Sequence, residues 1–210
     1  MALTLYVGSK RYSSWSLRPY LALAHTGAAF ETITILLDQQ DTKAKIGAVN
    51  PAGKVPVLHD DGLVIWDSLS ICEYVAELHP HAKLWPIDRS ARARARSISA
   101  EMHAGFAPLR RDMPMDLVAR KPGQGHTPEA LADARRVMQI WREVLSSSGG
   151  PFLFGHFTIA DAMYAPVTTR FTTYDVELDA TCRAYVAAIA ALPAYKQWHA
   201  DAAREPQTRA

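Results

Sequence analysis

The most telling segment of this chain reads Asn50-Pro51-Ala52-Gly53-Lys54-Val55-Pro56-Val57-Leu58. A proline at the head of a strand lacks a donor for the strand ladder, so Pro56 marks an edge or a bend. If the Val55–Pro56 bond is cis, the N–H and C=O of Val55 turn outward and can pair with a peptide ligand. Because only about 5–6 % of X–Pro bonds in folded proteins are cis, the residues alone do not support the cis isomer.

The residues around this segment alternate between strand and helix patterns. A β-branched run at Phe30–Leu37 is typical of a buried parallel strand, and Asp60-Asp61-Gly62 predicts the turn of an antiparallel hairpin. The expected strands cover 3–7, 30–37, 54–59 and 63–66, and the expected helices cover 17–24, 41–49 and 67–78. The order β-α-β-α-β-β-α describes a compact α/β unit with a parallel half and an antiparallel hairpin.

The character of the chain changes after Pro80, where a connector over 79–86 leads into helical patterns. The helical segments are expected at about 89–112, 128–147, 158–173, 180–191 and 193–204. No convincing strand pattern follows the connector. The sequence therefore predicts an α/β domain over residues 1–80 and an all-helical domain over residues 88–210.

Composition excludes several classes of protein. The chain has 210 residues, of which 49 % are apolar and 21 % charged, and a net charge of +2. These are ordinary values for a soluble globular protein, and nothing in them favours a nucleic-acid or membrane partner. No apolar run approaches the ~20 residues that span a bilayer, and we expect no secretory signal. Because Cys72 and Cys182 are far apart in apolar surroundings, we expect no disulfide, an inert Cys72 and a cytoplasmic protein.

Hydroxyl groups gather where the first strand meets the first helix, in Tyr12-Ser13-Ser14-Trp15-Ser16-Leu17-Arg18-Pro19. Unpaired backbone N–H groups and the positive end of the helix dipole meet at such a junction. The junction can therefore bind an anion or keep a thiol ionised. The alternative is that one of the serines only caps the helix.

A second helix start carries an acidic and a hydroxyl side chain, Asp67 and Ser68. The free N–H groups of this helix can take a ligand carboxylate, while Asp67 can pair with an ammonium group. The alternative is again a simple helix cap.

Together these motifs resemble those of the cytosolic glutathione transferases. The family shares the Asn-Pro-x-Gly-Lys-Val-Pro-x-Leu segment, the Asp-Ser pair that opens the third helix, and the order of elements. Phe157-Thr158-Ile159-Ala160-Asp161 is similar to the capping box of the family's helical domain. The resemblance covers nearly the whole chain. It implies a thioredoxin-like N-terminal domain, an all-helical C-terminal domain and a homodimer.

The resemblance also implies which residues bind glutathione: Gln39, Lys54, Val55, Pro56, Asp67 and Ser68. Val55 would pair with the cysteinyl backbone beside a cis proline, while Asp67 and Ser68 would hold the γ-glutamyl end. The side chains of Lys54 and Gln39 are candidates for the glycine carboxylate, the first as a point charge and the second as an amide donor.

The Ser13-Ser14 pair is similar to the paired serines of the zeta class, whose first serine activates the thiol. Zeta enzymes usually carry a cysteine after the pair, where this chain has Trp15. A hydrogen bond to a charged group contributes about 1.5–3 kcal/mol and a helix terminus about 0.3–1 kcal/mol. Both effects favour the thiolate of a cysteine-like thiol at neutral pH. We therefore expect Ser13, or failing that Ser14, to donate to the glutathione sulfur without a general base.

The electrophile is expected between the two domains, against the first helix of the second domain. Its candidate lining consists of Trp15, Met102, His103, Phe106, Arg110, Met113 and Met115. Adaptable methionine and aromatic side chains suit apolar substrates. The alternative is that those at helical spacing belong to the core.

The leading function implied is transfer of glutathione, as co-substrate, to small hydrophobic electrophiles. A second hypothesis is a glutathione-dependent cis–trans isomerase of the maleylacetoacetate type, for which Arg18 or Arg110 could bind a dicarboxylate. A third is a binding module of the same fold without turnover. The chain has no Gly-x-Ser-x-Gly, phosphate-binding loop, dinucleotide fingerprint, Cys-x-x-Cys or His-Glu-x-x-His, and we expect no metal.

Overall fold

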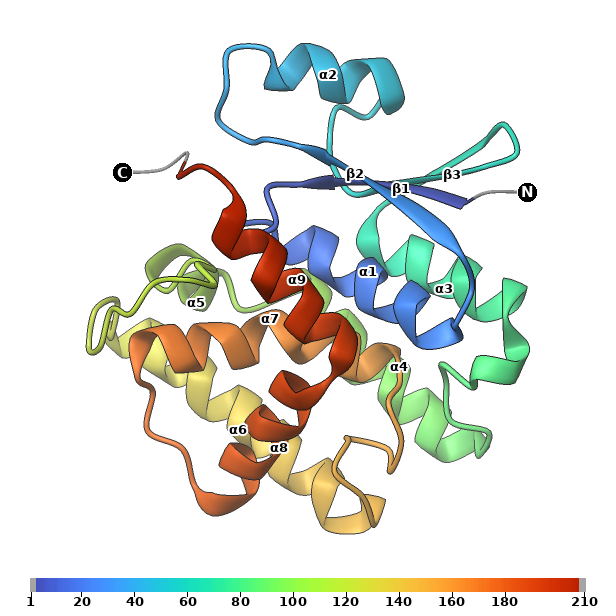
Figure 1. Cartoon of the computed structure of the whole chain (residues 1–210). Helices are drawn as coiled ribbons and strands as arrows, with labels where there is room; N and C mark the ends of the chain where they lie inside the picture. The colour runs from blue at the N-terminus through green and yellow to red at the C-terminus, as the bar shows by residue number, and fades with distance from the viewer. Residues whose placement is uncertain (1–2, 208–210) are drawn as a thin grey trace.

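The computed structural model describes residues 3–207 and begins with an α/β domain (Figure 1). The elements of this domain are β1 Leu3–Gly8, α1 Ser14–Thr26, β2 Phe30–Ile35, α2 Thr42–Val49, β3 Val57–Asp60, β4 Leu63–Trp66 and α3 Ser68–Leu78. Its strands form one sheet in the order β2-β1-β3-β4. β1 pairs parallel with β2 and antiparallel with β3, and β3 and β4 form the hairpin. The α/β fold class predicted from the sequence is confirmed.

Alternation along β1 explains how the sheet is covered. Leu3, Leu5 and Val7 are buried while the residues between them are half-buried. Leu5 lies opposite Leu58 of β3, and both side chains are fully buried. In Figure 1, α1 and α3 lie together on one face of the sheet and α2 lies on the other. The serine junction at the start of α1 therefore lies on the side of the sheet that faces the second domain.

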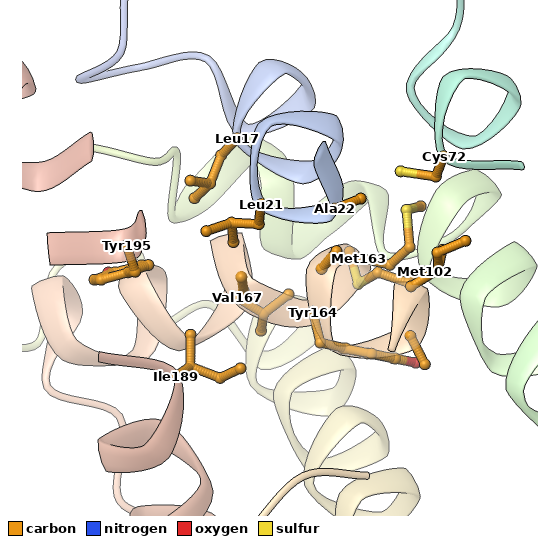
Figure 2. Close-up of a cluster of buried hydrophobic side chains, with 14 of the residues drawn as sticks. Leu17, Leu21, Ala22, Cys72, Met102, Met163, Tyr164, Val167, Ile189 and Tyr195 are labelled. Carbon is orange, nitrogen blue, oxygen red and sulfur yellow. The ribbon is translucent and has the colours of Figure 1, made fainter. Parts of the chain in front are cut away.

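The second domain is helical. After a short 3-10 turn, η1 Pro80–Ala82, it contains α4 Arg89–Ala104, α5 Ala107–Asp112, α6 Pro128–Ser148, α7 Ile159–Tyr174, α8 Ala180–Ala191 and α9 Pro193–Arg204. α7 is buried along almost its whole length and packs against α1, α4 and α8. Figure 2 shows Leu17 and Leu21 of α1 in the same buried cluster as Met163 and Val167 of α7. One hydrophobic core therefore joins the two domains.

The start of α7 is held by the predicted capping box. The buried carboxylate of Asp161 accepts the backbone N–H of Thr158 at 2.8 Å and that of Leu153 at 3.0 Å. It also accepts the Tyr185 hydroxyl at 3.1 Å. Removal of these acceptors would leave buried donors unpaired. The box thereby sets the position of α7 and of Arg170, which lies further along this helix.

Two helices replace the single helix predicted over 89–112. α4 ends at Ala104, and Phe106 adopts the left-handed conformation with a φ of 60°. A Cβ at Gly105 would lie 2.8 Å from the carbonyl oxygen of Glu101. Glycine tolerates this close approach because it has no Cβ. The left-handed conformation of Phe106 then turns the chain, and α5 starts in a new direction.

Two predicted strands are shorter than expected. The strand predicted over 30–37 ends at Ile35, and the N–H of Leu37 donates to the Ser9 hydroxyl at 2.8 Å. The strand predicted from Lys54 starts at Val57, and the bond between Val55 and Pro56 is cis. None of the helices within residues 3–207 combines the length and apolar character that a bilayer crossing requires.

Candidate functional site

The loop before β3 forms one wall of a cavity of about 580 Å³. The cavity is lined by Trp15, Ala52, Lys54, Val55, Pro56, Trp66, Asp67, Ser68 and His103. The buried side chain of Asn50 fixes this loop, because its amide donates to the Lys54 carbonyl at 2.6 Å and accepts the N–H of Ala52 at 3.0 Å. Val55 lies outside the register that pairs β3 with its neighbours. Its peptide groups are therefore available to a ligand that extends the sheet.

Asp67 has two roles at the start of α3. One carboxylate oxygen caps the helix by accepting the N–H groups of Leu69 at 2.9 Å and Ser70 at 3.2 Å. The other oxygen lies 3.2 Å from Nε2 of His103. The φ of Asp67 is 73°, a region that non-glycine residues rarely adopt. The neighbouring Ser68 hydroxyl is buried and, among the residues described, has no hydrogen-bond partner. Both side chains can thus meet a zwitterionic ligand group.

The two serines of the junction differ in what they contact. Ser13 caps α1 by accepting the N–H of Ser16, and its hydroxyl donates to Ser16 Oγ at 2.7 Å. Ser14, the first residue of α1, accepts a hydrogen bond from Arg170 at 3.3 Å. The hydroxyl hydrogen of Ser14 therefore stays available to a further acceptor, whereas that of Ser13 is used within its own turn.

A second cavity, of about 430 Å³, opens beside the serines. It is lined by Tyr12, Ser13, Ser14, Trp15, Leu37, Ile46, Lys54, Val55, Arg110, Pro114, Met115 and Arg170. Trp15, Lys54 and Val55 line both cavities. An elongated ligand can consequently run from Asp67 past Val55 to the serine junction.

Three arginines concentrate positive charge at this junction. Arg18 is fully buried, lies 4.3 Å over the Trp15 ring, and its guanidinium finds no hydrogen-bond partner within residues 3–207. Arg110 lies 4.7 Å over the same ring and donates to the Gly105 carbonyl at 3.0 Å. Arg170 is only 4 % exposed and donates to the carbonyl of Met113 as well as to Ser14.

Burial lowers the pKa of each of the three guanidinium groups, and for Arg18 and Arg170 the repulsion of neighbouring arginines adds to it. Burial lowers the pKa of Arg170 to about 9, so this group keeps its charge at neutral pH. A buried positive charge without an acidic partner is costly. An anion bound at the junction would offset that cost.

His103 belongs to the first cavity, with Asp67, and not to the second. Its ring meets Trp15 edge-on, with the ring centroids 5.2 Å apart. Burial lowers the pKa of His103, although the Asp67 carboxylate opposes this effect. The imidazole is therefore neutral at pH 7 and can donate from Nε2 to Asp67.

Several residues predicted to line the electrophile site lie elsewhere. Met102, Phe106 and Met113 are buried in the core and line neither cavity, whereas Met115 lines the second. Gln39 lines neither cavity; its amide donates to the carbonyls of Leu37 and Asp38. Met102, Met113 and Phe106 therefore pack as core residues, which is the alternative given for them above.

Sequence reasoning missed Arg170. This residue follows Ser14 by 156 positions, and no local motif surrounds it. One signal was available, because Asp161 and Arg170 are the charged residues of an otherwise uncharged helix, α7. The capping box accounts for Asp161 and leaves Arg170 without a structural reason.

Metal-ligating groups do not gather in the part of the chain that the structure describes. Over these residues, no cluster of three or more His, Cys, Asp or Glu side chains could hold a metal ion. Cys72 is fully buried, and burial raises the pKa of its thiol.

The chain matches family models in both of its domains. Residues 12–78 match the family described as the glutathione S-transferase N-terminal domain, and residues 124–201 match the corresponding C-terminal domain. A probable maleylacetoacetate isomerase of Caenorhabditis elegans is 30 % identical over 210 residues, which cover 97 % of this chain and 95 % of the relative. The maleylacetoacetate isomerase of Rattus norvegicus is 29 % identical over 212 residues, which cover 98 % of this chain and 95 % of that relative.

Solved structures share the fold. A glutathione transferase homologue from Burkholderia, with bound glutathione, has a TM-score of 0.74 at 24 % identity and covers 97 % of this chain and 98 % of its own. A maleyl pyruvate isomerase, described as a bacterial zeta-class enzyme, has a TM-score of 0.70 at 23 % identity. The shared region covers 93 % of this chain and 95 % of that structure.

Proposed function

Because this chain belongs to the glutathione S-transferase family, we propose that it binds reduced glutathione across the two cavities and holds the thiol as a thiolate with the hydroxyl of Ser14. The observation that carries this proposal is the hydrogen bond from Arg170 to Ser14. It occupies a lone pair of the hydroxyl oxygen and directs the hydroxyl hydrogen to another acceptor. Ser13 remains the alternative donor, and it would first have to leave Ser16.

The binding residues act along the length of the tripeptide. The cysteinyl backbone pairs with Val55 beside the cis Pro56. The γ-glutamyl ammonium meets the Asp67 carboxylate, and the γ-glutamyl carboxylate meets the Ser68 hydroxyl at the start of α3. Lys54 supplies charge to the glycine carboxylate. Gln39 could contribute there only by turning away from the carbonyls that it now contacts.

The thiolate is favoured by three effects at the junction. A hydrogen bond from a hydroxyl to the charged sulfur contributes about 1.5–3 kcal/mol, and the start of α1 adds about 0.3–1 kcal/mol. The cations Arg18, Arg110 and Arg170 supply the third effect. A free cysteine-like thiol has a pKa of about 8.5, so these effects make the thiolate the main form at neutral pH without a general base.

Conjugation is the first candidate reaction. The thiolate attacks an electrophilic carbon in the second cavity, a carbon–sulfur bond forms, and the leaving group departs with its electron pair. The side chains of Leu37, Ile46 and Met115 offer an apolar wall to such a substrate.

Isomerisation is the second candidate, favoured by the two arginines that line the same cavity, Arg110 and Arg170. These groups can hold the carboxylates of a cis-alkene diacid. The thiolate adds to one alkene carbon, the resulting single bond rotates, and loss of the thiolate restores the double bond in the trans form. The relatives named maleylacetoacetate isomerase support this candidate.

The proposal includes a homodimer. Leu63 and Trp66 of β4, an edge strand of the sheet, are exposed to 50 % and 49 %. Exposed apolar side chains on an edge strand favour coverage by another chain. Sedimentation analysis of wild type and Leu63→Lys would test it, because Leu63 lines neither cavity and the substitution is expected to yield monomers.

Four measurements test the function. Calorimetry with reduced glutathione is expected to show saturable binding, and an ultraviolet difference spectrum is expected to show bound thiolate at pH 7. Turnover of an activated chloroarene would support conjugation, while cis-to-trans conversion of a diacid would support isomerisation. Binding without either activity would indicate the non-catalytic module, and absence of binding at millimolar glutathione would refute the proposal.

A further inference from the structure

The carboxylate of Glu205, directly after α9, lies against the loop that carries the serines. One oxygen accepts the N–H of Lys10 at 2.9 Å, and the other accepts the N–H of Arg11 at 3.2 Å. The two donors are consecutive, and the acceptor is 195 and 194 residues away in the chain. A single carboxylate therefore satisfies both backbone donors at the tip of this loop.

α9 also holds the side chain and carbonyl of Lys10. The indole N–H of Trp198 donates to the Lys10 carbonyl at 2.9 Å, and the Lys10 ammonium lies 2.5 Å from the Asp201 carboxylate. The same ammonium lies 5.5 Å over the Trp198 ring. Three residues at the end of the helical domain thus contact one residue of the loop.

Arg11 is held from a second direction. Its guanidinium forms a two-point contact with Asp116, at 2.7 Å and 3.1 Å, and its carbonyl accepts the N–H of Leu117 at 3.2 Å. His199 of α9 contacts the Leu117 carbonyl at 3.1 Å. The loop tip therefore sits between α9 and the segment after α5.

Displacement of this tip would move the serines, because only a short turn separates the tip from Ser13 and Ser14. The N–H groups of Tyr12 and Ser13 both donate to the Ser9 carbonyl, at 3.0 Å and 2.8 Å, and the N–H of Ser14 donates to the Tyr12 carbonyl at 3.0 Å. These bonds transmit the position of Lys10 and Arg11 to the start of α1.

We propose that Glu205 is a positioning residue of the active site, which, with Trp198 and Asp201, couples the end of α9 to the serine that holds the glutathione sulfur. This inference rests on the proposed function. Glu205 lines neither cavity of the candidate site. Its effect therefore reaches the thiol through the loop and not through contact with glutathione.

The experiment compares full-length Glu205→Ala and Glu205→Gln with wild type, with Glu177→Ala as a matched control at an exposed position between α7 and α8. For Glu205→Ala, the pKa of bound glutathione is expected to rise by about one unit, and kcat for an activated chloroarene at pH 6.5 to fall about tenfold. KM for glutathione should change less than about twofold. For Glu205→Gln, the thiol pKa and kcat should lie between those of wild type and Glu205→Ala, because glutamine keeps one acceptor oxygen.

Amide hydrogen exchange gives a readout apart from activity. The N–H groups of Lys10 and Arg11 are expected to exchange faster in Glu205→Ala, while those of β1 keep the wild-type rate. A thiol pKa and loop exchange equal to wild type in Glu205→Ala would overturn the inference and leave the proposed function intact. Failure of wild type to lower the thiol pKa would overturn both.

Discussion

The guanidinium of Arg170 donates to the hydroxyl of Ser14 across the boundary between the domains, at 3.3 Å and over a separation of 156 residues. Within residues 3–207, Arg170 is the only one of the three junction arginines that donates a hydrogen bond to a serine. This contact makes the helical domain part of the thiol site. It also distinguishes Ser14 from Ser13, whose hydroxyl is engaged with Ser16.

Substitution of the two serines should separate a thiol donor from a helix cap. Ser14→Ala is expected to lose most of the thiolate absorbance of bound glutathione and to lower kcat by about 10- to 150-fold, the equivalent of a charged hydrogen bond. Ser13→Ala should retain the thiolate but lose about 0.5–2 kcal/mol of stability, because it removes the cap of α1. Urea unfolding and ultraviolet titration measure both effects. The reverse pattern would assign the thiol to Ser13.

Loss of Arg170 should affect charged substrates most. Arg170→Met keeps much of the side-chain volume in a buried position but removes the cation and the donor to Ser14. We expect turnover of a carboxylate-bearing substrate to fall about tenfold more than turnover of a neutral chloroarene. Circular dichroism would check that the variant is folded. An equal loss of turnover with both substrates would mean that Arg170 acts only on the glutathione thiol and does not bind the substrate carboxylate.

Asp67 should act on glutathione affinity and not on chemistry. Asparagine caps helices about as well as aspartate, so Asp67→Asn should keep α3 and remove the charge that meets the γ-glutamyl ammonium. KM for glutathione is expected to rise about tenfold while kcat at saturation changes little. Steady-state kinetics at varied glutathione would measure this. An unchanged KM would contradict the assignment of the γ-glutamyl end to Asp67.

Acid should weaken the fold through Asp112. Hydrogen bonds from Arg111 and Thr127 hold the pKa of this carboxyl at about 2, whereas an unfolded aspartate has a pKa of about 3.9. Because the folded pKa is the lower one, the stabilisation is present above about pH 4 and is lost as the pH falls through about 2. Asp112→Asn should therefore lose less stability than wild type between about pH 5 and pH 2 in urea unfolding. Parallel losses would speak against this role.

The features that could be predicted from the sequence are local. Strand alternation, the Asp60-Asp61-Gly62 turn, the helix start at Asp67 and the capping box of Thr158 and Asp161 all depend on preferences within one turn or one hairpin. The structure contains each of them. The cis state of Val55–Pro56 came from the family resemblance, because the residues alone favour trans.

The features that could not be predicted depend on how distant segments pack. Burial of Met102 in the core and the approach of His103 to Asp67 follow from the direction of α4. The contacts of Arg170 with Ser14 and of Glu205 with Lys10 join opposite ends of the chain. Spacing along a sequence specifies which side chains share a face of one element, but only the packing of α1 against α7 and α9 brings the serines to their arginine and carboxylate partners.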